Sequence, residues 1–250
     1  MSESAPDSFI NPQPSGVVDP RERATALLEI LLCSSIPTQL AIGAMLRLAG
    51  IPSTDAAGHL SLTFVLTLSL ADTTLLIVMM VFFMRVHGEM ARATWFGTGR
   101  GIREALIGLA TVPAVFIVVG LLLNTIRLFA PSLHNVENNP LEQLASTPGQ
   151  AAAFSLVAIV AGGVREELQR AFMLRRFEQY LGGATLGVWL LSAGFGLGHV
   201  MQGWDAVVTT AALGAFWAWM YLQRRNSIAP IASHAGFNSL EILRVALIGQ

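Results

Sequence analysis

Four charged residues stand where an apolar helix would be expected to continue, and they are the residues of this chain best placed to do chemistry. They follow the apolar segment 151–163 with no turn signal between, and they are Arg165, Glu166, Glu167 and Arg170. Charge at membrane depth costs several kcal/mol per group, so such residues usually face a cavity, form pairs and take part in function. We therefore predict that one helix, from 150 to about 177, carries the functional site.

The spacing of these residues separates the two glutamates. Arg170 lies four residues after Glu166 and three after Glu167, and either spacing allows an ion pair on one helix face. Adjacent residues point about 100° apart around a helix, so neighbouring glutamates cannot share one role. One can pair with Arg170 while the other faces a cavity, where a carboxylate can serve as a general base. The alternative is a purely structural cluster of ion pairs that joins helices.

Two later apolar segments each carry one histidine, His199 and His234. The turn at 182–183 lies midway between Glu166 and His199, so an antiparallel hairpin would bring these two side chains to the same depth. Asn238 lies four residues after His234 on the same helix face. This pair of hydrogen-bond donors suits an oxyanion that develops on a carbonyl.

The composition indicates which elements must position these side chains. Hydrophobic residues make up 53% of the 250 residues and charged residues only 12%, and the mean hydropathy is +0.59. Soluble proteins carry roughly 25% charged residues. The apolar residues come in blocks of about twenty, the length that spans a bilayer. We expect an all-α polytopic integral membrane protein of about seven transmembrane helices, with the last four forming the catalytic core. The expected spans are 24–48, 60–85, 104–129, 150–177, 184–204, 206–223 and 227–247.

Charge and cysteine content exclude two classes of protein. The net charge of −1 argues against nucleic-acid binding, which needs a basic face. The single cysteine, Cys33, excludes an intrachain disulfide framework. Residues 1–22 are polar at their start and rich in Pro, Ser and Asp, which predicts a disordered cytoplasmic tail. Residues 23–250 would form one transmembrane domain, with the motif-bearing core at 150–247.

The distribution of arginines predicts the orientation in the membrane. Arginine-rich short loops stay in the cytoplasm. Along this chain, arginine-rich predicted loops alternate with predicted loops that contain no arginine. The segments 49–59 and 130–149 contain no arginine, whereas 86–103 and 224–226 are arginine-rich. We expect the inner membrane of a prokaryote, with the N-terminus in the cytoplasm, the C-terminus outside and the site open toward the cytoplasm.

Three further polar residues need an interpretation. Asp72 lies near the centre of the second predicted span, and we expect it to hydrogen-bond a neighbouring helix rather than to line the cavity. His87 and His134 lie in or beside loops, where we expect solvated side chains and not ligands.

The ordered motifs resemble a known family. Glu166-Glu167-x-x-Arg170, Phe195-x-x-x-His199 and His234-x-x-x-Asn238 on successive helices look like the CAAX protease and bacteriocin-processing family. These are intramembrane endopeptidases related to the CAAX prenyl protease and are also called the abortive-infection family. The resemblance covers roughly 150–245. The family places three residues between Glu-Glu and Arg, whereas this chain has two.

The resemblance implies a role for each site residue. Glu166 and His199 would activate a water, and His234 and Asn238 would stabilise the oxyanion of the tetrahedral intermediate. Glu167 and Arg170 would form a supporting ion pair.

The resemblance also favours catalysis without a metal or other cofactor. Two histidines and a carboxylate match a catalytic zinc set in type, so zinc is the alternative. No His-x-x-x-His motif or cysteine pair supplies local ligand spacing.

The expected activity is hydrolysis of a peptide bond near the C-terminus of a membrane-associated or prenylated peptide. The expected partners are this peptide or lipidated protein and the bilayer, and the sequence does not define an oligomer. The alternative function is a non-catalytic membrane scaffold or immunity protein that uses the polar cluster for assembly. A transporter is a third possibility, but no inverted repeat is evident.

Overall fold

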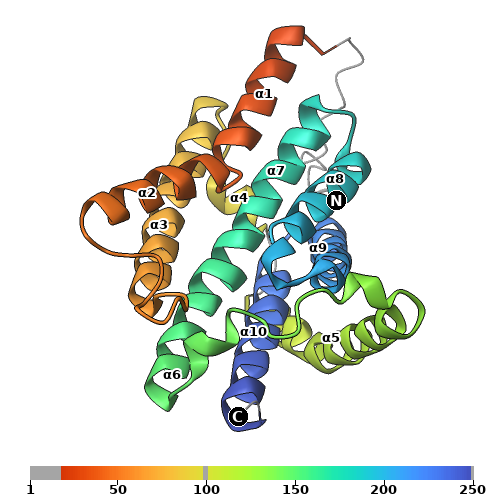
Figure 1. The fold of residues 1–250 in the computed structure, drawn as a ribbon. Helices are drawn as coiled ribbons and strands as arrows, with labels where there is room; N and C mark the ends of the chain where they lie inside the picture. The colour runs from red at the N-terminus through yellow and green to blue at the C-terminus, as the bar shows by residue number, and fades with distance from the viewer. Residues whose placement is uncertain (1–17, 98–100, 249–250) are drawn as a thin grey trace.

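The computed structural model describes residues 18–97 and 101–248, and these residues form an all-α protein (Figure 1). Their only β-type pairing is a single bridge between Thr54 and Leu60. The helices are α1 (Pro20–Leu32), α2 (Ile36–Leu48), α3 (Leu62–Val86), α4 (Ala91–Phe96), α5 (Gly101–Phe129), α6 (Pro148–Val157), α7 (Glu166–Tyr180), α8 (Ala184–Leu197), α9 (Trp204–Arg224) and α10 (Ile228–Ile248). The predicted tail at 1–22 lies mostly outside the described residues, and its last three residues already belong to α1.

Three helical stretches are long and apolar enough to cross a membrane, namely 20–48, 62–86 and 101–129. They correspond to the first three predicted spans. The four later predicted spans also form helices, but these are shorter or more polar. The span predicted as 184–204 was too long, because its α-helix ends at Leu197, before His199. The fold is therefore that of an all-α polytopic integral membrane protein, with the polar residues concentrated in its second half.

The first predicted span is not one helix, and that part of the prediction is wrong. α1 ends at Leu32, α2 begins at Ile36, and the two helices meet at an angle (Figure 1). Between them Ser35 has a φ of 69°, a left-handed conformation that breaks a right-handed helix. Pro37 then occupies the first turn of α2, where its missing N–H costs nothing. We call residues 33–35 the α1–α2 elbow.

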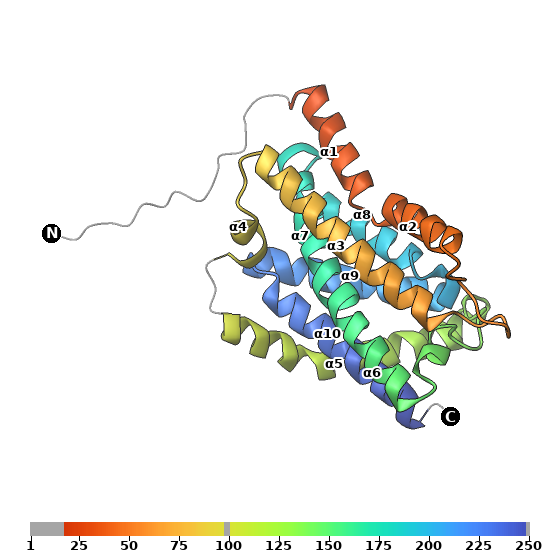
Figure 2. The same ribbon diagram turned by 90° about the vertical axis from the view of Figure 1, so that its left-hand side faces the viewer.

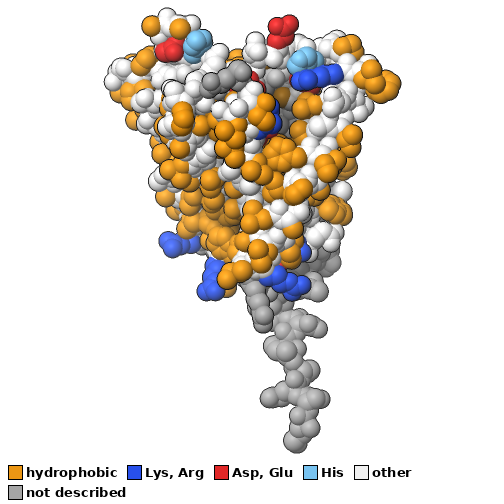
Figure 3. Space-filling view, turned by 90° about the horizontal axis from the view of Figure 1, so that it is seen from below, with side chains coloured by type: hydrophobic (Ala, Val, Ile, Leu, Met, Phe, Trp, Pro, Cys, Tyr) orange, Lys and Arg blue, Asp and Glu red, His pale blue; other side chains and the backbone are white. Residues whose placement is uncertain are grey.

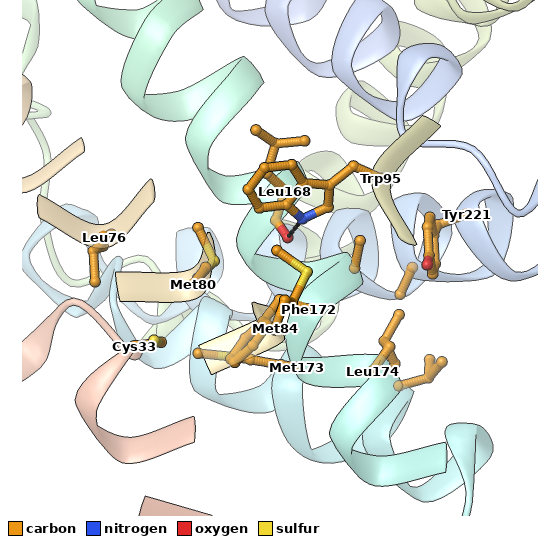
Figure 4. Packing of buried hydrophobic residues seen from close by; sticks show 13 residues of the cluster. Cys33, Leu76, Met80, Met84, Trp95, Leu168, Phe172, Met173, Leu174 and Tyr221 are labelled. Carbon is orange, nitrogen blue, oxygen red and sulfur yellow. Dashed lines mark hydrogen bonds between the residues drawn. The ribbon is translucent and has the colours of Figure 1, made fainter. Parts of the chain in front are cut away.

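α7 lies at the centre of the molecule, with α1, α3 and α4 packed on one side and α8 and α9 on the other (Figures 1 and 2). Its Phe172 and Leu174 are completely buried in one hydrophobic cluster with Met80 and Met84 of α3. The Trp95 indole N–H donates to the carbonyl of Leu168 at 3.1 Å, which joins α4 to α7 (Figure 4). Because α7 is packed on both sides, its polar side chains have fixed neighbours.

A π-helical turn, Ala158–Arg165, joins α6 to α7, so the predicted helix 150–177 is continuous but widened before the glutamates. Single π-helical turns of this kind are frequent at functional sites. Two glycines in the turn allow α10 to approach closely. A Cβ on Gly163 would lie 2.6 Å from the Cβ of Ala235, and one on Gly162 would lie 2.7 Å from the Nδ2 of Asn238.

The loops gather at two opposite ends of the molecule. The segments 87–90 and 225–227 lie at one end, and 49–61, 130–147 and 198–203 lie at the other (Figure 2). Basic side chains gather along the lower edge of the surface in Figure 3, beneath a broad hydrophobic belt, whereas histidine and acidic side chains, with a basic one beside them, lie along the upper edge. This polarity is the one expected from the arginine distribution. Which end faces the cytoplasm stays a prediction.

Candidate active site

Glu167 is the most deeply buried acid of the predicted site, with 1% of its side chain exposed. Its Oε1 accepts hydrogen bonds from Nη1 of Arg170 and, at 2.8 Å, from Nδ1 of His234. The shortened spacing between Glu-Glu and Arg therefore still permits an ion pair, three residues apart on α7. The Arg170 guanidinium also lies over the ring of Phe195, 4.9 Å from its centroid. Glu167 is thus held through Oε1, while its Oε2 is buried without a hydrogen-bond partner among the described residues.

Glu166 has a different environment from its neighbour, as the angular argument predicts. Its side chain is 22% exposed, and its Oε1 accepts a hydrogen bond from Nη2 of Arg165 at 3.0 Å. Its Oε2 lies 3.9 Å from Nε2 of His234, too far for a hydrogen bond. Of the two glutamates, Glu166 has a carboxylate oxygen that remains available to a water or substrate.

His234 is buried on α10 and is held from three directions. Its ring stacks on Trp217 with centroids 3.8 Å apart, and the Trp217 indole N–H donates to the hydroxyl of Ser233 at 3.1 Å. Its Nδ1 is directed at Glu167, which leaves Nε2 facing Glu166. With Nδ1–H donating to Glu167, His234 has a second donor at Nε2 only when doubly protonated.

His199 lies just beyond the end of α8 and is half-buried. Its Nδ1 is 2.8 Å from the carbonyl of Phe195, so the Nδ1–H donates there and Nε2 is left as an acceptor. The Phe195 ring packs edge-on against both histidines, with centroids 4.9 Å from His199 and 6.1 Å from His234. No hydrogen bond joins His199 to Glu166 in the described part of the chain, so a water between them would have to complete the predicted pair.

Asn238 lies one turn after His234 on α10 and is also half-buried. Its amide lies against Gly162 of the π-helical turn, where a Cβ would displace it. The structure therefore gathers the predicted residues of α7 and α10 around one place, with His199 linked to them through Phe195. Their catalytic roles stay predictions.

Several residues at and around the site were missed or misread from the sequence. Arg165 contacts Glu166 directly and also pairs with Asp72 of α3 at 3.5 Å. Asp72 bonds α2, in agreement with the helix–helix hydrogen bond that we expected. The two loop histidines are not simply solvated, and that prediction is wrong. His87 lies 2.7 Å from Glu29, and His134 lies 2.7 Å from Asp205, because each faces a buried carboxylate.

The predicted opening of the site toward the cytoplasm stays a prediction. The part of α7 that follows the glutamates is tightly packed, and four of its residues have at most 4% of their surface exposed, namely Leu168, Ala171, Phe172 and Leu174. His199 lies at the end of α8 that meets the arginine-free loops. There the amide of Asn139 donates to Gln202 at 3.2 Å, which docks the 130–147 segment beside the histidine.

No group of three or more His, Cys, Asp or Glu side chains in the described residues is arranged to hold a metal ion. Glu167 and His234 hydrogen-bond each other through Oε1 and Nδ1. Catalysis without a metal therefore stays a prediction.

Residues 148–240 match the family model described as type II CAAX prenyl endopeptidase, Rce1-like. The match covers well under half of the chain, from the start of α6 into α10, and includes all six residues that we predicted for the site. No curated protein and no solved structure matches the chain.

Proposed function

We propose that this chain, whose residues 148–240 belong to the Rce1-like family of type II CAAX prenyl endopeptidases, is an intramembrane endopeptidase that uses glutamate to activate water. The observation that supports the proposal is the difference in environment between two adjacent glutamates. Glu167 is buried and bonded by Arg170 and His234, whereas the Glu166 side chain is 22% exposed and its Oε2 lies beside His234 without a hydrogen bond. A cluster that only joined helices would be expected to bond both oxygens of Glu166.

The reaction would begin with a water held between Glu166 and His199. Glu166 takes one proton as the water oxygen attacks the carbonyl carbon of the scissile peptide bond. The carbonyl oxygen becomes an oxyanion, which accepts hydrogen bonds from Asn238 and from Nε2 of doubly protonated His234. The proton on Glu166 then passes to the leaving amine as the carbon–nitrogen bond breaks. The products are a new carboxylate and a new amine.

Nucleophilic catalysis by a serine or cysteine has less support. Cys33 is completely buried in the α1–α2 elbow. The hydroxyl of Ser233, next to His234, is already bonded by Trp217 and Thr111. Both arrangements favour direct attack by water.

The substrate would be a membrane-associated or prenylated peptide, cut near its C-terminus. The test is to incubate purified protein in lipid vesicles with a farnesylated CAAX peptide and with the same peptide lacking the lipid. Mass spectrometry should show one new C-terminus, and Glu166→Gln protein should not produce it. The scaffold alternative predicts no cleavage by any variant and a large loss of stability in Glu166→Gln.

A further inference from the structure

Arg165 directly precedes the two glutamates and has no role in the family motifs, and its guanidinium is hydrogen-bonded at Nε, Nη1 and Nη2. Only 6% of the residue is exposed. Its Nε donates to the carbonyl of Ala161 at 3.2 Å, and its Nη1 donates to the hydroxyl of Ser35 and, at 3.3 Å, to Oε1 of Gln169. Its Nη2 donates to Glu166 at 3.0 Å. A planar guanidinium held at Nε and Nη1 has little freedom left at Nη2.

Asp72 holds the same guanidinium from α3. The carboxylate is completely buried and lies 3.5 Å from Nη1 of Arg165. It cannot easily move, because its Oδ1 accepts from Thr38 at 2.5 Å and its Oδ2 accepts from Gln39 at 3.2 Å. Arg165 is therefore shared between a fixed carboxylate on one side and Glu166 on the other.

The α1–α2 elbow completes this enclosure. The Gln169 amide donates to the carbonyl of Cys33 at 2.5 Å and to the hydroxyl of Ser35 at 3.3 Å. Ser35 adopts a left-handed conformation that few residues other than glycine tolerate, and the contacts with Arg165 and Gln169 hold it there. The break that divides the first predicted span thus places its polar atoms beside the catalytic helix.

We propose that Arg165 is a positioning residue for Glu166, and that Asp72 and the α1–α2 elbow hold Arg165 in place. The inference rests on the proposed function. By binding Oε1 of Glu166, Nη2 of Arg165 leaves Oε2 free to hold the attacking water, at 3.9 Å from Nε2 of His234. The functional unit then reaches beyond the matched segment 148–240 to residues 33–72, which carry no family motif.

The test measures kcat and KM of Arg165→Gln and Arg165→Lys with the farnesylated peptide in vesicles. The matched control is Arg175→Gln, which removes a half-exposed arginine from the far end of the same helix. Misplacing a catalytic group by about 1 Å costs on the order of 100-fold in rate, so Arg165→Gln should lower kcat by about that factor with KM unchanged. Lysine keeps the charge but not the planar fork, so Arg165→Lys should restore only part of kcat.

Two results would overturn the inference. One is Arg165→Gln protein that is folded and turns over like the Arg175→Gln control, and the other is full restoration of kcat by lysine. A thermal double-mutant cycle between Arg165→Gln and Glu166→Gln gives a second readout that does not require activity. The two substitutions should be non-additive, and additivity would also contradict the inference. A wild-type protein that cleaves no peptide while the cycle shows coupling would contradict the proposed function alone.

Discussion

The buried pair of Glu167 and Arg170 should contribute a large share of the stability of this protein. Both side chains are at most 5% exposed, and breaking a buried pair by removing one partner costs about 3–5 kcal/mol. For a chain of this length each kcal/mol shifts the thermal midpoint by roughly 2–4 °C, so either single substitution should lower it by about 6–20 °C. Such a loss would be easy to measure in detergent.

The two single variants should not be equal. Glu167→Ala leaves the buried Arg170 cation without its carboxylate and also removes the acceptor of His234. Arg170→Ala leaves Glu167 with His234 as a remaining donor. We therefore expect Glu167→Ala to lower the midpoint more than Arg170→Ala, and the double variant to cost less than the sum.

Thermal-shift measurements on the two single variants and the double variant test this reasoning. The matched control is Arg244→Ala, whose pair with Glu241 is about half exposed and should be worth at most about 1 kcal/mol. Glu166→Ala should leave stability unchanged or raised, because it removes a carboxylate kept for chemistry. If Arg170 were coupled to Glu166 and not to Glu167, the assigned roles would be reversed and Glu167 would become the candidate base.

Three further predictions concern the packing of Gly163, the dependence on a metal and the orientation in the membrane. Gly163→Ala should destabilise the protein by about 1–3 kcal/mol through its clash with Ala235, whereas Gly120→Ala, with nothing within 4 Å, should not; equal thermal midpoints would contradict the close packing of α6–α7 on α10. Dialysis against a strong chelator should leave cleavage intact, and loss of activity that added zinc restores would show a metal enzyme. In a Cys33→Ser background, a cysteine at the exposed Asn138 should react with an impermeant thiol reagent from outside and one at the exposed Ala93 should not; the reverse pattern would invert the orientation.

The sequence predicted the helices of the core because their apolar blocks and motif spacings are local properties. The helix period of 3.6 residues was enough to predict that the two adjacent glutamates have different surroundings. The pair of Arg170 with Glu167 agrees with the predicted supporting pair, and the catalytic roles stay predictions.

The contacts that the sequence did not reveal come from residues far apart in the chain. Arg165 and Asp72 are 93 positions apart, and Arg165 and Ser35 are 130 apart, so no local spacing links them. The elbow itself had a local signal, Ser34-Ser35-Ile36-Pro37. The length of the apolar segment 24–48 nevertheless favoured one continuous helix. The pairs of His87 with Glu29 and His134 with Asp205 were missed for the same reason as Arg165, because loops fold back onto buried carboxylates.

The central claim is that Glu166 activates the water, and the most direct test is the cleavage rate of Glu166→Gln protein. Loss of a general base typically costs about 10²- to 10⁴-fold, so this variant should lose cleavage by at least about 100-fold with an unchanged thermal midpoint. Glu241→Gln, an exposed glutamate on α10, should cleave at the wild-type rate. Wild-type turnover in folded Glu166→Gln protein would contradict the account.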